Sequence, residues 1–153
     1  METAYDLLAA HPFLAGLTDD QLERLSYWSS RSMFHAGNRI FRENGQADRF
    51  WLIQRGQVNL DTHIAGRGEV VVETLGPGSV LGWSWMFAPY RWHFGAVAIE
   101  NTFTVSVDAH GIRALSERDP VLGYELSRRF IQVVVERLQA TRVRLLDLYQ
   151  PAS

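Results

Sequence analysis

Hydrophobic residues at helical spacing open the chain and predict two short helices. The first periodic run is Ala4–Ala10, which must stop before Pro12 because the residue preceding a proline avoids the helical region. Thr18 and Gln21 have the spacing of a capping box. The apolar residues that follow them predict a second helix that ends near Ser29–Ser30.

Between residues 31 and 108 the pattern changes to short β-rich runs separated by Gly, Asn and Pro. Many short strands with turn residues between them predict a sandwich or a barrel. The strands are expected at Ser32–Phe34, Arg39–Phe41, Arg49–Gln54, Gln57–His63, Glu69–Leu75, Gly95–Glu100 and Phe103–Asp108.

Helical patterns return after residue 108, first as a short helix over His110–Arg118 and then as a long one. The Asp119–Pro120 pair is a typical helix start, and no proline interrupts the chain from there to Tyr149. One apolar stripe on this helix consists of Leu122, Leu126, Phe130 and Val133.

A second stripe on the long helix alternates steps of three and four residues, as a heptad seam does. This spacing favours a parallel homodimeric coiled coil over packing within the chain, because so long a helix projects beyond a small barrel. The expected interface residues are Ile131, Val134, Leu138, Thr141, Leu145 and Leu148.

Length and composition set the broad class. A chain of 153 residues suits one domain, expected as helices over 1–30, a β-roll over 31–108 and helices over 109–149. The formal net charge of −2 gives no basic field for nucleic acid. The absence of cysteine excludes disulfides, thiol catalysis and iron–sulfur clusters.

The sequence also lacks the features typical of secreted, membrane-spanning, metal-binding and catalytic proteins. The start of the chain does not read as a secretory signal and no apolar run could span a membrane, so a cytoplasmic protein is expected. The five histidines show no metal spacing, and no catalytic motif stands out. Neither catalytic residues nor metal ligands are expected, and the protein is interpreted as a non-enzyme.

The segment Gly76–Glu100 is dense in aromatic side chains after a glycine-rich turn. These rings could fill the core, line a pocket for an apolar or cationic ligand, or form an exposed docking patch. The sequence supports the first two interpretations about equally and the third somewhat less.

The stretch HAGNRIFRENGQADRFWLIQRGQVNL carries a spaced set of turn glycines and inward apolar residues. Together with the turn after residue 74, this set resembles the cyclic nucleotide-binding domain of the cyclic AMP receptor protein and fumarate–nitrate regulator family of bacteria. The similarity covers roughly Leu14 to Tyr149. The matching residues are Gly37, Ile40, Gly45, Ala47, Asp48, Leu52, Ile53, Gly56, Val58, Leu75, Gly76, Gly78 and Gly82.

The resemblance implies a mainly β fold with flanking helices. The expected architecture is a β jelly roll, or double-stranded β-helix, with N-terminal helices and a long C-terminal helix. In the family a DNA-binding domain follows the long helix, and the chain is expected to lack it because the sequence ends there.

The family holds a cyclic nucleotide with a Gly-Glu pair, whose Glu accepts the ribose hydroxyl, and with an Arg on the phosphate. Here Gly82 matches, whereas Trp83 stands at the Glu position and His93 at the Arg position. Losing the phosphate contact costs about 2–5 kcal/mol, and losing the ribose acceptor costs about 1–3 kcal/mol. Ordinary cyclic AMP binding is therefore disfavoured.

A modified nucleotide remains an alternative ligand, because a loop shift could bring Arg91 to a phosphate and a protonated His93 could bind an anion. By the resemblance, Thr141 stands where the long helix meets the base, beside Arg142. The candidate pocket therefore comprises Gly82, Trp83, Ser84, Trp85, Arg91, Trp92, His93, Phe94, Thr141 and Arg142.

The sequence predicts a dimeric sensor module that relays its ligand state through the last helix to an unknown partner protein. The alternatives are a ligand-free interaction or scaffold module whose pocket is plugged by Trp83, Trp92 and Phe94, and a binder of another small effector. No cofactor is expected.

Overall fold

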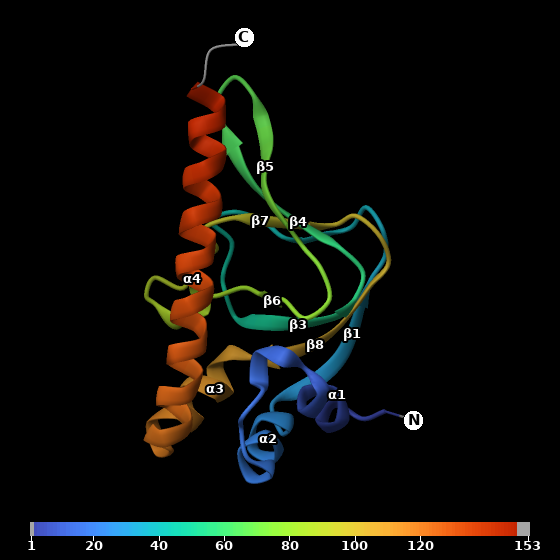
Figure 1. Ribbon diagram of the computed structural model, residues 1–153, viewed down its shortest axis with the longest axis vertical. Coiled ribbons are helices and arrows are strands. Elements are labelled where there is room, and N and C mark those ends of the chain that lie inside the picture. The colour runs from blue at the N-terminus through green and yellow to red at the C-terminus, as the bar shows by residue number, and fades with distance from the viewer. Residues whose placement is uncertain (1, 150–153) are drawn as a thin grey trace.

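The computed structural model describes residues 2–149 and begins with two short helices. Helix α1 spans Ala4–Ala10, the 3-10 helix η1 spans Pro12–Leu14, and α2 spans Asp19–Ser26. The expected capping box starts α2, where Thr18 and Gln21 each bond the backbone N–H of the other. These N-terminal helices lie together beneath the β-roll (Figure 1).

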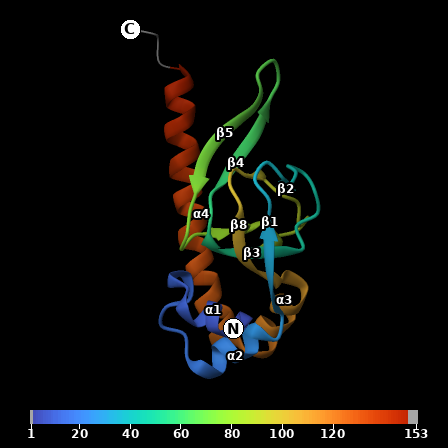
Figure 2. The same ribbon diagram turned by 90° about the vertical axis from the view of Figure 1, so that its right-hand side faces the viewer.

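Eight strands within residues 2–149 form the β-roll as two antiparallel sheets of four strands. The strand order is β1-β8-β3-β6 in one sheet and β2-β7-β4-β5 in the other. The β4–β5 hairpin extends past the rest of the roll along the last helix (Figure 2). The strands are β1 (Ser29–Phe34), β2 (Arg39–Phe41), β3 (Arg49–Arg55), β4 (Val58–Ile64), β5 (Gly68–Leu75), β6 (Val80–Leu81), β7 (Gly95–Ala98) and β8 (Thr102–Asp108).

The first strand starts earlier than the sequence indicates. Helix α2 ends at Ser26 and β1 already begins at Ser29, where a strand was expected only from residue 32. The reason is its pairing with β8, which starts with Ser29 opposite Val107 and continues without a register shift. The hydroxyls of Ser30 and Ser106 bond across this ladder at 3.1 Å. Tertiary pairing therefore determines this boundary in a stretch with little apolar alternation.

Two helices complete the chain. Helix α3 spans Ala109–Arg118 and crosses so close to Trp28 that a Cβ at Gly111 would overlap its indole ring. Helix α4 spans Pro120–Tyr149, as the Asp-Pro start predicts, and runs the full height of the molecule beside the roll (Figure 1). No helix among residues 2–149 has the length and apolar character required to cross a membrane.

The core joins the first half of α4 to the roll. The predicted stripe of Leu122, Leu126, Phe130 and Val133 is buried. The Phe130 ring lies edge-on to Phe50 at 5.0 Å and to Trp85 at 5.1 Å between ring centroids. This aromatic cluster fixes the start of α4 on the roll, because buried rings contribute large apolar areas and specific contact geometry.

A buried histidine attaches η1 to the roll. The Nε2–H of His11 donates to the carbonyl of Ile53 at 3.0 Å, and its Nδ1 accepts from the N–H of Phe13. Burial lowers the pKa of His11 below its ordinary value, although the hydrogen bond to Ile53 partly opposes this shift. The folded chain therefore holds His11 as a neutral ring.

This neutral ring makes stability depend on pH. Below about pH 6.5 the unfolded chain gains a proton on His11 that the folded chain resists, so the unfolding free energy should fall by up to about 1.4 kcal/mol per pH unit. Urea unfolding at pH 7.5 and pH 5.5 measures the loss. A His11→Asn variant should lose less on acidification, and His35→Asn, which changes an exposed ring, should behave as wild type. Equal losses in all three chains would contradict the assignment.

Candidate functional site

Trp92 occupies the place where the sequence predicts a ligand pocket. Its ring lies against Gly82, which directly follows β6 and has a φ of +97°. A Cβ at Gly82 would approach the indole to 2.9 Å. The backbone of Trp92 is clamped by the loop before β3, since its N–H donates to Gly45 and its carbonyl accepts from Asn44. Gly82 therefore serves here as the residue that leaves room for an indole.

Three aromatic rings stack inside the roll beside this glycine. Trp92 is only 4% exposed and stacks on Phe41 with 3.9 Å between ring centroids, while Trp51 lies 5.8 Å from Trp92. The space left beside them is a cavity of about 10 Å³. Such a volume holds one water molecule at most, whereas small-molecule sites occupy about 300–1,000 Å³. The lining residues are Phe41, Leu60, Gly82, Trp83, Ser84, Trp92, Phe94 and Arg137.

A second stacked pair covers the outer side of the cavity. The half-buried Trp83 ring lies parallel to His93 at 4.6 Å and edge-on to Phe94 at 6.5 Å. The buried Ser84 hydroxyl lies 2.8 Å from Nδ1 of His93 and accepts from the His93 backbone N–H. The residues at the two expected ligand positions, Trp83 and His93, thus contact each other.

The other predicted pocket residues lie away from the cavity. The exposed Arg91 donates to the carbonyl of Asn44, and Trp85 lies in the core against Phe50. Thr141 donates its hydroxyl to the carbonyl of Arg137, and the exposed Arg142 does not line the cavity. The structure therefore brings together Gly82, Trp83, Ser84, Trp92, His93 and Phe94 from the predicted set.

Three residues that line the cavity were not predicted from the sequence, namely Phe41, Leu60 and the charged Arg137. Arg137 is 5% exposed, and its guanidinium donates to Glu73 of β5 and to the carbonyl of Val80 in β6, with all three distances 3.2 Å. Burial lowers the pKa of Arg137 and the Glu73 carboxylate opposes this shift, yet an arginine stays charged in proteins. The sequence did contain a signal, because Arg137 continues the buried stripe four residues after Val133.

The pair of Arg137 and Glu73 should be a measurable link between α4 and β5. A Glu73→Gln change leaves the buried guanidinium without its counter-charge and should lower the unfolding free energy by about 1–3 kcal/mol, because Glu73 is partly exposed. Chemical unfolding measures the loss. Adding Arg137→Met should recover most of it. An unchanged midpoint for Glu73→Gln would contradict the link, and Glu69→Gln on the same strand is the control.

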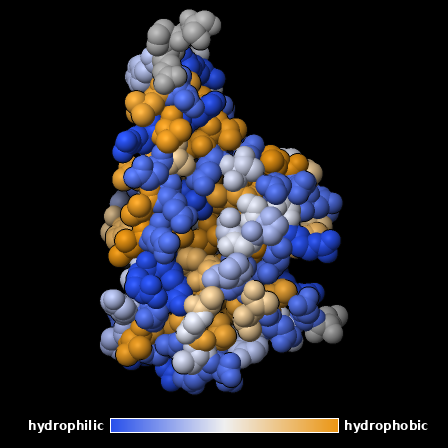
Figure 3. Space-filling view, in the orientation of Figure 1, coloured by the Kyte–Doolittle hydropathy of each residue, from blue (hydrophilic) through white to orange (hydrophobic). Residues whose placement is uncertain are grey.

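The far half of α4 exposes an apolar face. Figure 3 shows hydrophobic side chains interleaved with polar ones along this helix. Leu138 is 64% exposed and Leu145 is 52% exposed. We define the exposed seam as Ile131, Val135, Leu138, Leu145, Leu146 and Tyr149.

The exposed seam overlaps the predicted dimer interface only in part. Ile131, Leu138 and Leu145 belong to both sets. Val134, Thr141 and Leu148 are half-buried within the chain. Val134 and Thr141 follow the buried Phe130 and Arg137 by four residues, which places them beside the buried face of α4.

Among residues 2–149 no three His, Asp or Glu side chains gather closely enough to hold an ion.

Comparison with known proteins identifies the fold. A family model described as cyclic nucleotide-binding domain matches residues 31–119, which is more than half of the chain. The chain belongs to this family. The matched region runs from within β1 through the rest of the β-roll and the whole of α3, so the predicted jelly roll with flanking helices and the predicted family resemblance are both confirmed.

Similar members of the cyclic nucleotide-binding domain family include a regulator and two solved structures. The chain is 24% identical over 94% of its length to a CRP-like cAMP-activated global transcriptional regulator of Mycobacterium tuberculosis, and it spans 62% of that relative. A candidate cyclic nucleotide-binding protein of Geobacter metallireducens GS-15 is 30% identical over 90% of the chain and 99% of the structure, with a TM-score of 0.78. A cyclic nucleotide-binding domain of Methylobacillus flagellatus KT matches in fold, at 18% identity over 99% and 89% with a TM-score of 0.84.

Within the cyclic nucleotide-binding fold, this chain carries different residues from those expected for the family at the two ligand positions. The position expected to carry a carboxylate holds Trp83, and the position expected to carry a guanidinium holds the exposed His93. The guanidinium that does reach the cavity is Arg137, which is already paired with Glu73. Charge on this side of the cavity is therefore balanced within the protein.

Proposed function

We propose that the chain is a non-enzymatic regulatory interaction module whose β-roll works without a nucleotide, because Trp92 fills the pocket. Two copies pair through the exposed seam of α4, and α4 connects the roll to a partner protein. Among the functions that the sequence left open, the closed pocket favours this module over a sensor that takes a ligand into the roll.

The single observation that carries the proposal is the 10 Å³ cavity beside Gly82. A nucleotide could enter only if Trp92 left its stack with Phe41 and exposed its buried ring. Removing a buried aromatic side chain from its core costs about 3–5 kcal/mol. With the phosphate and ribose contacts also missing, nucleotide binding would be too weak to regulate the protein.

A loop shift that brings Arg91 to a nucleotide phosphate has little support. Arg91 is bonded to the Asn44 carbonyl, and a bridge between Gln46 and Arg91 holds the same loop. Moving Arg91 inward would also displace Trp92, whose backbone bonds to the neighbouring Gly45.

Pairing through α4 is supported by the exposed seam, which lies on the side of the helix that its own roll leaves uncovered. Apolar side chains at heptad-like spacing gain burial when two helices pair. The partner helix of a second copy would cover Leu138 and Leu145 together.

Sedimentation velocity on the full chain, with and without millimolar cyclic AMP, tests the proposal. We expect a dimer in both samples with the same sedimentation coefficient. A monomer would refute the pairing, and a change of state on adding cyclic AMP would refute the closed pocket.

A further inference from the structure

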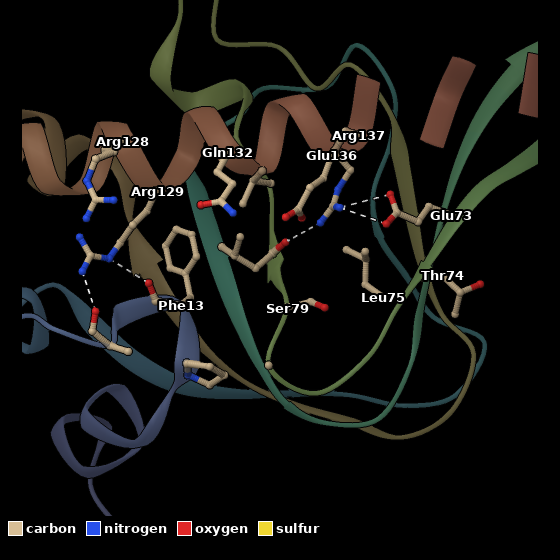
Figure 4. A pocket seen from close by; sticks show the side chains of 15 residues that line it. Phe13, Glu73, Thr74, Leu75, Ser79, Arg128, Arg129, Gln132, Glu136 and Arg137 are labelled. Carbon is tan, nitrogen blue, oxygen red and sulfur yellow. Dashed lines mark hydrogen bonds and ion pairs between the residues drawn. The ribbon is translucent and has the colours of Figure 1, made fainter. Parts of the chain in front are cut away.

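A cleft much larger than the closed cavity also borders α4. The cleft has a volume of about 450 Å³ and lies between α4, η1 and the connection from β5 to β6 (Figure 4). Arg137 lines both the cleft and the closed cavity. The α4 side of the cleft is formed by Arg128, Arg129, Gln132, Val133, Glu136 and Arg137.

Two of the arginines in the cleft are committed to the fold. Arg129 donates to the carbonyls of Phe13 and Ala15 and pairs with Glu125, so it ties η1 to α4. Arg137 is held by Glu73 and the Val80 carbonyl. Neither guanidinium is available as the main contact for a ligand.

A row of three other side chains on α4 faces the cleft with free polar groups (Figure 4). Arg128 is 55% exposed and uses one nitrogen to contact Glu125. Gln132 and Glu136 follow at four-residue steps, and within residues 2–149 neither side chain has a hydrogen-bond or ion-pair partner. The row therefore offers a cation at one end, an amide in the middle and a carboxylate at the other end.

The dimensions of this row match a short extended peptide. Eight residues of helix separate Arg128 from Glu136, a rise of about 12 Å. An extended chain covers about 13 Å in four residues, and its residues i, i+2 and i+4 face the same side. The floor between the two charged ends is apolar, with buried Val133, Leu75 and Val80.

We propose that the cleft binds an extended segment of a partner protein with an acidic residue at i, an apolar residue at i+2 and a basic residue at i+4. The acidic side chain meets Arg128, the apolar one covers Val133, and the basic one meets Glu136. A purely anionic ligand such as a phosphate fits poorly, because the unpaired carboxylate of Glu136 would repel it. The inference rests on the proposed function in taking a partner protein's segment as the occupant.

Fluorescence anisotropy of labelled, end-blocked pentapeptides on the full chain tests this site. The probe Asp-Ala-Leu-Ala-Arg should bind saturably and at least fivefold tighter than Asp-Ala-Leu-Ala-Asp or Arg-Ala-Leu-Ala-Arg. Arg128→Glu and Glu136→Arg should each weaken the probe at least fivefold. The double variant should restore binding, because the peptide can lie in the reverse direction. Arg144→Glu, which changes an exposed arginine of α4 outside the cleft, should have no effect.

Absence of binding, equal binding of the three peptides, or a double variant as weak as the single ones would overturn the inference. If the single variants instead change the sedimentation coefficient of the free protein, the occupant is a second copy and the inference also fails. A chain that binds no peptide but stays dimeric and insensitive to cyclic AMP would leave the proposed function standing.

Discussion

Replacing Trp92 by alanine should lower the free energy of unfolding by about 3–5 kcal/mol, the usual cost of removing a large buried ring from a core. The residue is 4% exposed and contacts Phe41 and Trp51 inside the roll. The loss should appear in urea unfolding followed by circular dichroism. The apolar cavity created should accept indole, as engineered dry cavities accept apolar ligands.

Two further measurements separate this effect from a general weakening of the loop. Trp92→Phe should keep part of the stack and lose less stability than the alanine variant. Trp83→Ala, which removes the half-buried outer ring, should also lose less. Indole should raise the melting temperature of the alanine variant alone. If Trp92→Ala is as stable as wild type, the indole is no plug and the account of the pocket is wrong.

The double variant Leu138→Glu with Leu145→Glu should convert the dimer to monomer. Each leucine contributes about 1.5–3 kcal/mol when buried, so even one position lost from both copies should weaken pairing about 10²-fold to 10⁴-fold. The glutamates would also face their symmetry mates as like charges. Sedimentation equilibrium measures the dissociation constant.

The matched control for the seam is Val143→Glu. Val143 is an exposed apolar residue of the same half of α4 but is not part of the exposed seam. It should remain dimeric. If Val143→Glu dissociates the dimer while the double variant at Leu138 and Leu145 remains dimeric, the interface lies on another face of the helix.

The sequence predicted the architecture well where local chemistry determines it. The Asp119–Pro120 start and the capping box at Thr18 placed two helices correctly, because both features act within one turn. The start of β1 at Ser29 was not predicted, because it depends on pairing with a strand more than seventy residues away. The two-residue strand β6 is too short to show an alternating pattern.

The candidate site could be located from the sequence, but the packing and pairing of its side chains could not be predicted. The glycine turn and the missing charges identified the loop around Gly82. Whether its rings filled or lined the pocket depended on Phe41 and Trp51, which reach Trp92 from strands elsewhere in the chain. The internal partner of Arg137 was equally out of reach, since Glu73 lies 64 residues earlier.

Calorimetric titration of cyclic AMP into the full chain at 25 °C tests the closed pocket most directly. With Trp92 in the place of a ligand, we predict only the heat of dilution up to millimolar nucleotide. A saturable heat signal with a micromolar dissociation constant would contradict the account, because it would require the Trp92 ring to leave the roll.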